Sequence, residues 1–125
     1  MFSALEAPLY EIKANLFKAL AHPVRIRVLE ILVASPGQEC TVATLLAETG
    51  LEASHLSQHL SVLRRHRVVT SVRSASSVTY SLAHPKVAEL LGIARAFLLD
   101  TLEDMREQLS TAQQLPALSG AEVVH

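Results

Sequence analysis

The spacing of apolar residues changes once along this chain, and this change constrains the fold more than any other feature of the sequence. Before about residue 66 and after about residue 84, apolar residues recur at helical spacing, which predicts amphipathic helices. Between these regions, β-forming residues lie on both sides of the polar segment Ser74-Ala75-Ser76-Ser77, a pattern typical of a hairpin. The β-forming residues are Val68, Val69, Val72, Val78, Tyr80 and Leu82. The sequence therefore predicts a mainly α-helical fold with one small β-hairpin.

Helix-breaking and capping residues divide the helical regions. Pro23 suits the first position of a helix, so one helix ends before it and another begins there. Ser35-Pro36-Gly37 stops that second helix, Thr41 is the expected N-cap of a short third one, and Gly50 fits its left-handed C-terminal cap. His84-Pro85 opens the last helix. The predicted helices cover residues 9–21, 23–34, 42–49, 53–66 and 84–109.

The order of these elements favours one architecture. A short helix, a brief turn and a second helix are how readers of duplex DNA present one helix to the major groove. With the hairpin and the last helix after them, the order predicts a winged helix-turn-helix. At 125 residues, half of them hydrophobic, the chain is expected to form one domain over residues 1–115. The weakly patterned residues 116–125 are predicted to be a disordered tail.

Residues 53–86 contain no Asp or Glu, although the whole chain has a formal net charge of −1. Acidic residues gather before and after this segment, so the charge balance is local. A positive segment with hydrogen-bonding side chains on a helix is the footprint of a protein that binds duplex DNA. The segment holds Arg64, Arg65, Arg67, Arg73 and Lys86, together with His55, His59, His66 and His84.

The fourth predicted helix has an apolar stripe and an opposite polar face. At about 100° per residue, Leu56, Leu60 and Leu63 form the stripe, and His59 lies near its edge. Gln can pair with adenine edges, Ser can contact bases or phosphates, and Arg holds phosphates. The alternative is a solvent-exposed helix that happens to be polar outside. The predicted DNA-contacting residues are Ser54, His55, Ser57, Gln58, His59, Ser61, Arg64, Arg65, Arg67 and, in the hairpin, Arg73.

Four segments of the chain resemble the ArsR/SmtB family of bacterial winged-helix regulators. They are FKALAHPVRIRVLEIL, LLAETG, SHLSQHLSVLRRHRVV and VTYSL, and the resemblance covers residue 9 to about residue 100. It implies a homodimeric DNA-binding protein, usually a repressor that an effector releases from DNA. Ser57, Gln58 and His59 match the motif of the family's recognition helix, the helix that enters the major groove.

Two positions depart from the family pattern. Arg67 stands where the family commonly has Gly, which tolerates a left-handed backbone better than Arg does. The tip of the hairpin often carries basic residues in the family, but here it is Ser74-Ala75-Ser76-Ser77. Arg73 is therefore the main candidate for contact between the hairpin and DNA.

Many family members sense metals, but the ligand sets that the resemblance implies are incomplete here. Cys40 is the only cysteine, so a Cys-x-Cys site and an internal disulfide are both impossible. The four places of a second family site fall on His84, Lys86, Phe97 and Asp100, and Lys and Phe are not metal ligands. His55 and His59 have a spacing that can hold zinc, but on the recognition helix a metal would compete with DNA. We expect no metal and no cofactor, while a metal- or redox-responsive member with a non-standard site stays open.

The sequence shows no catalytic motif and no membrane segment. Its glycines form no phosphate-binding loop, and neither a Gly-x-Ser-x-Gly nor a His-Glu-x-x-His pattern occurs. No leader and no run of 18 apolar residues is present, so a cytoplasmic protein is expected. We predict that the protein is not an enzyme.

The last predicted helix carries an apolar stripe that is longer than a small core can cover. An exposed stripe of that length favours a partner helix, so we predict a homodimer joined by this helix and the first one. A two-fold dimer would place its two recognition helices about 34 Å apart and select an inverted repeat in DNA. The predicted dimer residues are Leu9, Ile12, Leu16, Leu91, Ala94, Leu98, Leu102, Met105 and Leu109.

The sequence thus predicts a sequence-specific, DNA-binding transcriptional regulator, a repressor that binds double-stranded DNA as a homodimer. The alternative is a winged-helix module that binds another protein and no DNA, since this fold alone does not dictate function. The segment without acidic residues beside the Ser/Gln face favours DNA.

Overall fold

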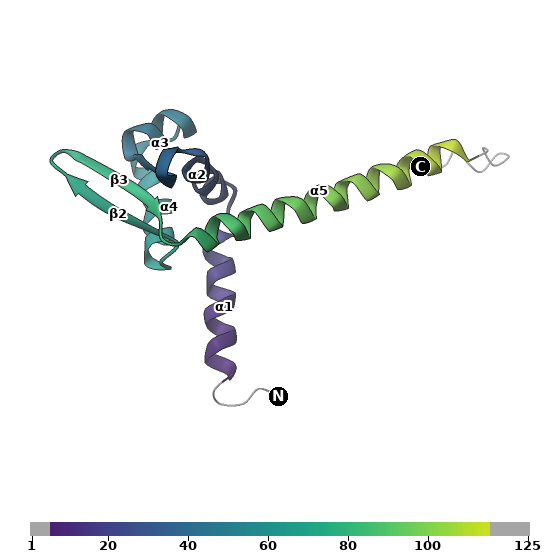
Figure 1. Ribbon diagram of the computed structural model, residues 1–125, viewed down its shortest axis with the longest axis horizontal. Helices are drawn as coiled ribbons and strands as arrows, with labels where there is room; N and C mark the ends of the chain where they lie inside the picture. Colours follow the sequence, from purple (N-terminus) through teal and green to yellow (C-terminus); the bar gives the residue numbers. More distant parts are fainter. Residues whose placement is uncertain (1–5, 116–125) are drawn as a thin grey trace. The chain divides into compact units, whose positions relative to one another are not determined.

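Five α-helices and a three-stranded sheet make up residues 6–115, the part of the chain that the computed structural model describes (Figure 1). This order confirms the predicted winged helix-turn-helix, with α3 and α4 as its two helices and β2 and β3 as the wing. The predicted tail, residues 116–125, lies outside the described residues. The elements are α1 (Glu6–Leu20), α2 (Pro23–Ala34), a short 3-10 turn (Pro36–Gln38), β1 (Glu39–Thr41), α3 (Val42–Thr49), α4 (Ala53–Arg65), β2 (Val69–Ser74), β3 (Ser77–Leu82) and α5 (Pro85–Gln114).

The contacts within the chain group it into two units, one that ends at Leu90 and one that begins at Leu91. The sequence predicts a single domain over residues 1–115. Among the described residues, the second unit consists of one helix, most of α5. A single helix has no other element within its unit to cover its apolar side chains.

The predicted caps account for where the helices begin and end. His22 is the N-cap of α2: its Nδ1 accepts a hydrogen bond from the backbone N–H of Val24 at 3.1 Å. Thr41 caps α3 in the same way, because its Oγ1 accepts from the N–H of Thr44 at 3.1 Å. Gly50 ends α3 with a φ of 70° and donates to the carbonyl of Leu46. The predicted start of α2 at Pro23 and the predicted caps Thr41 and Gly50 are confirmed.

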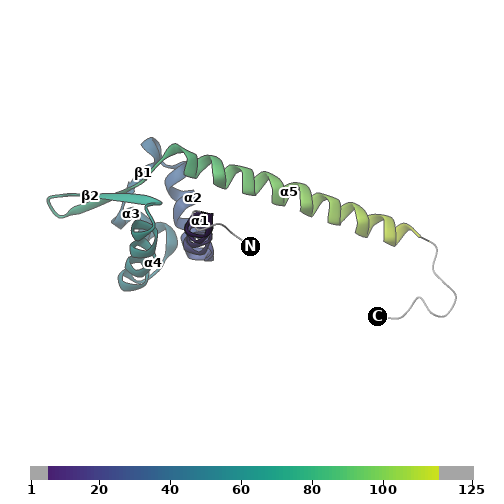
Figure 2. The ribbon, with the colours of Figure 1, turned by 90° about the horizontal axis from the view of Figure 1, so that it is seen from below.

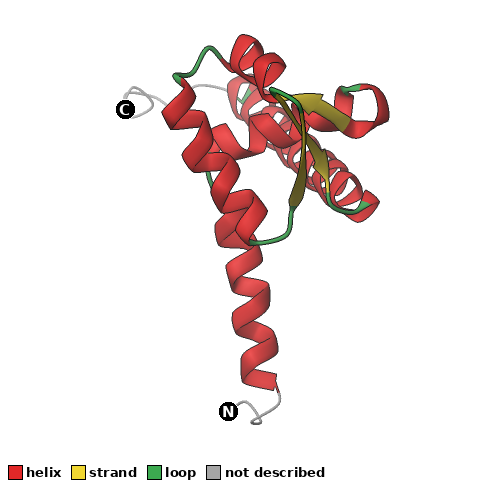
Figure 3. Ribbon diagram, turned by 90° about the vertical axis from the view of Figure 1, so that its left-hand side faces the viewer, coloured by secondary structure: helices red, strands yellow, loops and turns green. Residues whose placement is uncertain are grey.

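The sheet contains one strand that the sequence did not predict. β2 and β3 form the predicted antiparallel hairpin, and β1 adds to the other edge of β3, which gives the order β1-β3-β2 (strands in yellow, Figure 3). Cys40 of β1 lies opposite Tyr80 of β3. Three residues are too few to show an alternating pattern, so β1 leaves no signal in the sequence.

The core of the first unit is aliphatic. The helices α2 and α3 contact β3, and α4 contacts β2, so the sheet packs against the helix-turn-helix (Figure 2). The predicted stripe of α4 is buried, with Leu56 and Leu63 fully inaccessible. Burial of a Leu side chain stabilises the fold by roughly 1.5–3 kcal/mol. The other core residues of this unit are Ala19, Leu20, Val28, Leu29, Leu32, Leu45, Leu60, Val68, Val69 and Tyr80.

Candidate nucleic-acid interface

The helix α4 exposes a polar face opposite its buried leucines. Because Leu56, Leu60 and Leu63 point into the core, the side chains on the other side of the helix are left in solvent. This face carries hydroxyl, amide and imidazole groups and no carboxylate. Its exposed residues are Ser54, His55, Ser57, Gln58 and Ser61, followed by Arg64 and Arg65 at the end of the helix.

A cleft of about 410 Å³ lies between α4 and the wing. Arg64 and Ser57 of α4 line it from one side, and Ser71 and Arg73 of β2 line it from the other. Arg64 donates a hydrogen bond from Nη1 to the Oγ of Ser71 at 3.4 Å, which ties the helix to the wing. The remaining lining residues are Val42, Ala53, Leu60, Val78 and Tyr80.

The chemistry of this cleft suits an anion. Two arginines from different elements line it together with Ser57 and Ser71, and no lining residue is acidic. Guanidinium groups donate several hydrogen bonds in a fixed geometry that matches phosphate oxygens. The sequence assigned Arg73 to the wing, but only the structure shows that it shares a cleft with Arg64. The contribution of Ser71 was missed, because nothing in the sequence pairs it with a residue seven positions earlier.

The structure places His59 away from the exposed face. Its side chain is only 8% exposed, and its Nδ1 lies 3.3 Å from Nη1 of Arg25 in α2. The ring of His22 is also close, with 4.3 Å between the ring centroids. The prediction that His59 contacts DNA does not fit this burial. The helical spacing indicated only that His59 lies near the edge of the apolar stripe, and the contact with Arg25 shows that its side chain lies on the buried side.

Burial also sets the protonation state of His59. Loss of solvent is the main cause that lowers the pKa of its imidazole, and the neighbouring His22, Arg25 and His55 lower that pKa further. The ring is therefore neutral at pH 7, since the ordinary pKa of His is about 6.5.

Arg67 connects α4 to the wing in a left-handed conformation with a φ of 60°. Its backbone N–H donates to the carbonyl of Arg64 at 3.0 Å, and the next residue, Val68, donates to Leu63 at 2.9 Å. A residue with a Cβ is strained at this φ, which is the feature the Gly of the family pattern would relieve. The Arg67 side chain is exposed at the end of the recognition helix, as a phosphate contact requires.

Within residues 6–115, no group of three or more His, Cys, Asp or Glu side chains could hold a metal ion. His55 and His59 do not form an open pair, because His59 is buried against Arg25. Cys40 is half-buried, and burial raises the pKa of its thiol, so the protonated form is favoured. Among the same residues, no helix has both the length and the apolarity needed to span a bilayer.

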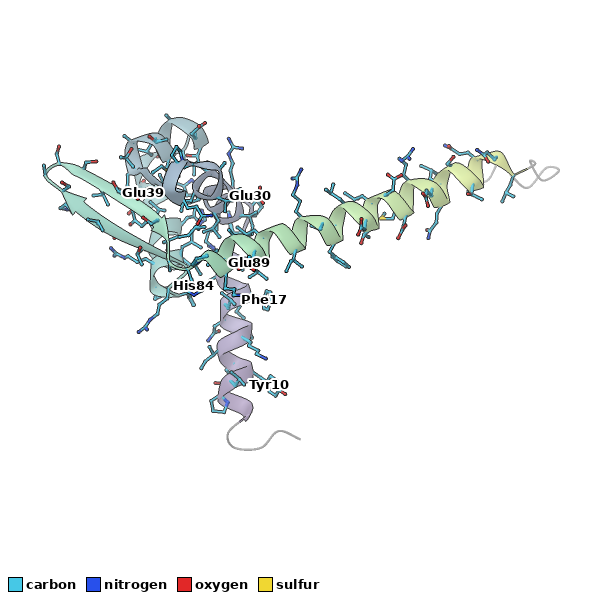
Figure 4. All side chains as sticks on the ribbon, viewed as in Figure 1. Tyr10, Phe17, Glu30, Glu39, His84 and Glu89 are labelled. Carbon is cyan, nitrogen blue, oxygen red and sulfur yellow. The ribbon has the colours of Figure 1, made fainter. Side chains whose placement is uncertain are left out.

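Apolar side chains are exposed along α1 and α5. On α1, Leu9 and Ile12 are exposed and Leu16 is half-buried, and Tyr10 and Phe17 also project from the helix (Figure 4). On α5, the predicted dimer residues Ala94, Leu98, Leu102, Met105 and Leu109 are all exposed. Ile93, Phe97 and Leu99 are also exposed, although they are not among the predicted dimer residues.

Leu91 differs from the other predicted dimer residues. Its side chain is 8% exposed in the single chain, so it has little surface left to give to a partner. The apolar stripe of α5 that remains accessible begins after it.

Comparison with known proteins identifies the same elements. A family model described as a helix-turn-helix domain matches residues 20–72, from the end of α1 to the middle of β2. The helix-turn-helix-type transcriptional regulator Rv0081 of Mycobacterium tuberculosis is 50% identical over 98 residues, which cover 78% of this chain and 83% of the relative.

Solved structures agree with this similarity. The crystal structure of Rv0081 matches with a TM-score of 0.72 at 49% identity, over 78% of this chain and 96% of that one. NolR from Sinorhizobium fredii matches with a TM-score of 0.69 at 34% identity, over 78% and 94% of the two chains. A homodimeric winged helix-turn-helix DNA-binding domain from Mycobacterium bovis, described as a possible ArsR-family regulator, matches with a TM-score of 0.70 at 26% identity, over 78% and 88%.

Proposed function

This chain belongs to the ArsR/SmtB family of winged helix-turn-helix transcriptional regulators, which bind DNA and are not enzymes, and on that premise we propose how it binds its operator. It acts as a homodimeric repressor in the cytoplasm. Each protomer inserts α4, the recognition helix, into the major groove of one half of an inverted repeat.

The observation that carries this proposal is the exposed face of α4. It offers Ser, Gln and His side chains toward the N-terminal part of the helix, where recognition helices contact base edges, and arginines at the other end. Gln58 pairs with an adenine edge, because its amide can donate and accept at once. Ser54, His55, Ser57 and Ser61 surround it and contact bases or neighbouring phosphates.

The cleft between α4 and the wing holds the DNA backbone. A phosphate seated there receives donors from Arg64 and Arg73, and the hydroxyl groups of Ser57 and Ser71 complete its surroundings. With a tip that lacks charge, the wing contributes through this cleft and not through an inserted basic tip. Arg65 and Arg67 contact further phosphates beside it.

The second copy of the chain covers the exposed apolar residues of α1 and α5. Exposed apolar side chains along each of these helices are a liability in a monomer, and a partner of the same sequence covers them. The homodimeric domain from Mycobacterium bovis supports this arrangement by its similarity to the chain. The two-fold symmetry of such a dimer selects half-sites about one turn of DNA, roughly 34 Å, apart.

The test is recovery of bound sites from a library of random duplexes, followed by affinity measurements over a range of salt concentrations. The recovered sites are expected to be inverted repeats. Four arginines in each protomer predict a slope of log affinity against log salt of about −7. Binding that salt does not weaken, or no binding to any duplex, would overturn the proposal and favour a protein-interaction module.

A further inference from the structure

Arg25 lies where three helices meet. It is half-buried at the start of α2, and its guanidinium bonds to two other elements. Nε donates to the carbonyl of Ala19 at 2.6 Å and Nη2 donates to the carbonyl of Lys18 at 3.2 Å, both in the last turn of α1. Nη1 faces Nδ1 of His59 in α4 at 3.3 Å. One side chain thus joins the C-terminus of α1 to the recognition helix.

The bonds of Arg25 to α1 are favourable for a simple reason. The last carbonyls of a helix lack partners within the helix and carry a partial negative charge, which a cation stabilises. Arg25 therefore has a fixed anchor on α1, and its third donor is directed at His59.

The partner of the His59 imidazole determines which ring nitrogen of His59 accepts a hydrogen bond. Arg can only donate, so Nδ1 of His59 must accept and the ring proton must be on Nε2. Likewise, Nδ1 of His22 accepts from the N–H of Val24. These roles follow from the donors, not from observed hydrogens.

Every charged or titratable group that acts on His59 opposes its protonation. These groups are Arg25 of α2, His22 in the turn before α2, and His55 on α4 itself, whose ring centroid lies 5.4 Å away. Burial acts in the same direction and is the largest cause of the lowered pKa. Within the described residues, no carboxylate and no group of β2 is among those that affect the pKa of His59. A protonated His59 would therefore have no neighbouring anion to stabilise its charge.

We propose that Arg25 and His59 form a proton-sensitive joint that positions the recognition helix against the end of α1. A proton on Nδ1 of His59 replaces the acceptor by a second donor and places two cations beside each other. The contact then has to open, and α4 loses its tie to α1. The effect on DNA rests on the proposed function, because a displaced α4 fits the major groove less well and α1 carries part of the dimer surface.

The direction of the pH effect follows from the lowered pKa. Between the folded pKa of His59 and its unfolded value of about 6.5, the unfolded chain binds more protons than the folded one. The contribution of His59 to stability is therefore complete above pH 6.5 or so and falls as the pH falls toward the folded pKa. A variant at His59 is needed to separate the effect of this ring on DNA affinity from other effects of pH.

The first experiment observes the joint without DNA. The imidazole signals of the full chain are followed by NMR between pH 5 and pH 8, folded and in urea, and His59→Asn identifies the signal of His59. We expect His59 to gain its proton at a lower pH in the folded chain than in urea. Arg25→Gln, which removes the charge and keeps a donor, should raise that pH, and Arg27→Gln in the same helix should not. Proton uptake at the same or a higher pH in the folded chain would overturn the joint.

The second experiment measures affinity for an inverted repeat recovered from a random library at pH 8 and pH 6. His59→Asn keeps an acceptor near the position of Nδ1 but does not titrate, so its affinity at pH 8 should resemble that of the unchanged chain. The unchanged chain should lose roughly threefold or more affinity relative to the variant at pH 6. Parallel pH profiles would overturn the proposal. If no duplex is bound at either pH, the proposed function fails, and the NMR titration still decides the joint.

Discussion

At the scale of single residues, this structure separates exposed side chains of α4, which we propose contact DNA, from buried side chains that hold this helix in place. Gln58 and His59 are neighbours in the sequence, yet one is exposed and the other is buried against Arg25. The sequence pattern identified the polar face of α4 as a whole. It could not assign His59, whose place at the edge of the stripe is decided by Arg25, a residue 34 positions away.

Gln58→Ala and Arg65→Ala should have different effects on DNA binding. In the proposed complex Gln58 contacts a base edge, so its loss should reduce the discrimination between operator sequences by about 1–3 kcal/mol at one base pair. In the proposed complex Arg65 contacts a phosphate, so its loss should weaken binding to all duplexes by similar factors and reduce the salt dependence of binding. Affinities for a panel of single-base operator variants measure both, and the same pattern of losses in the two variants would contradict this division.

The left-handed Arg67 allows a test of backbone strain. Arg67→Gly should raise the free energy of unfolding by about 0.5–1 kcal/mol, because glycine relieves the strain at positive φ but is more flexible in the unfolded chain. Arg67→Ala is the matched control, since it removes the same charge and keeps the Cβ. Urea unfolding measures both variants, and equal stability of the two would show that the strain is negligible.

At the scale of elements, helix caps explain why so much of the fold is predictable from the sequence. Pro23, Thr41 and Gly50 act through the backbone of their own turns, so local sequence determines where α2 and α3 begin and α3 ends. The cleft between α4 and the wing could not be predicted in this way. It depends on the pairing of β2 with β3 and on the packing of α4 against β2, which bring Arg64 and Arg73 together.

Substitution of Gly50 by Ala and of Gly92 by Ala should change the stability of the fold in opposite directions. A Cβ at either position would meet no atom within 4 Å, so the effect of each substitution on stability depends only on the backbone conformation. Gly50→Ala should destabilise the fold by about 1 kcal/mol, because the cap of α3 requires a φ of 70°. Gly92→Ala lies inside α5 and should favour the helix by about 0.5–1 kcal/mol. Thermal unfolding followed by circular dichroism compares the two, and a loss of stability in both would contradict this account.

At the scale of the whole molecule, apolar side chains of α1 and α5 are exposed in the single chain, which supports the proposed homodimer. The sequence predicted this from the length of the stripe. It could not predict that Leu91 is already buried, since both buried and exposed residues belong to the same helical spacing.

Leu102→Glu should convert the proposed dimer to a monomer without unfolding the chain. Leu102 is 58% exposed in the single chain, so a charge there is tolerated by the monomer but costs several kcal/mol when a partner helix covers it. Sedimentation equilibrium should show the monomer mass, and affinity for an inverted repeat should fall by about tenfold or more. Gln108→Glu, an exposed polar position on the same helix, is the control. A Leu102→Glu chain that remains dimeric would place the interface elsewhere.

The strand β1 has a consequence for how the wing can change in length during evolution. It pairs Glu39–Thr41 with Thr79–Ser81, so the register of β3 is set at the base of the wing, far from its tip. Insertion of two residues between Ser74 and Ser77 would add one cross-strand pair and lengthen the wing by about 3.3 Å, without turning any existing side chain to the other face. Relatives could therefore acquire longer or basic wing tips while the cleft beside α4 stays unchanged.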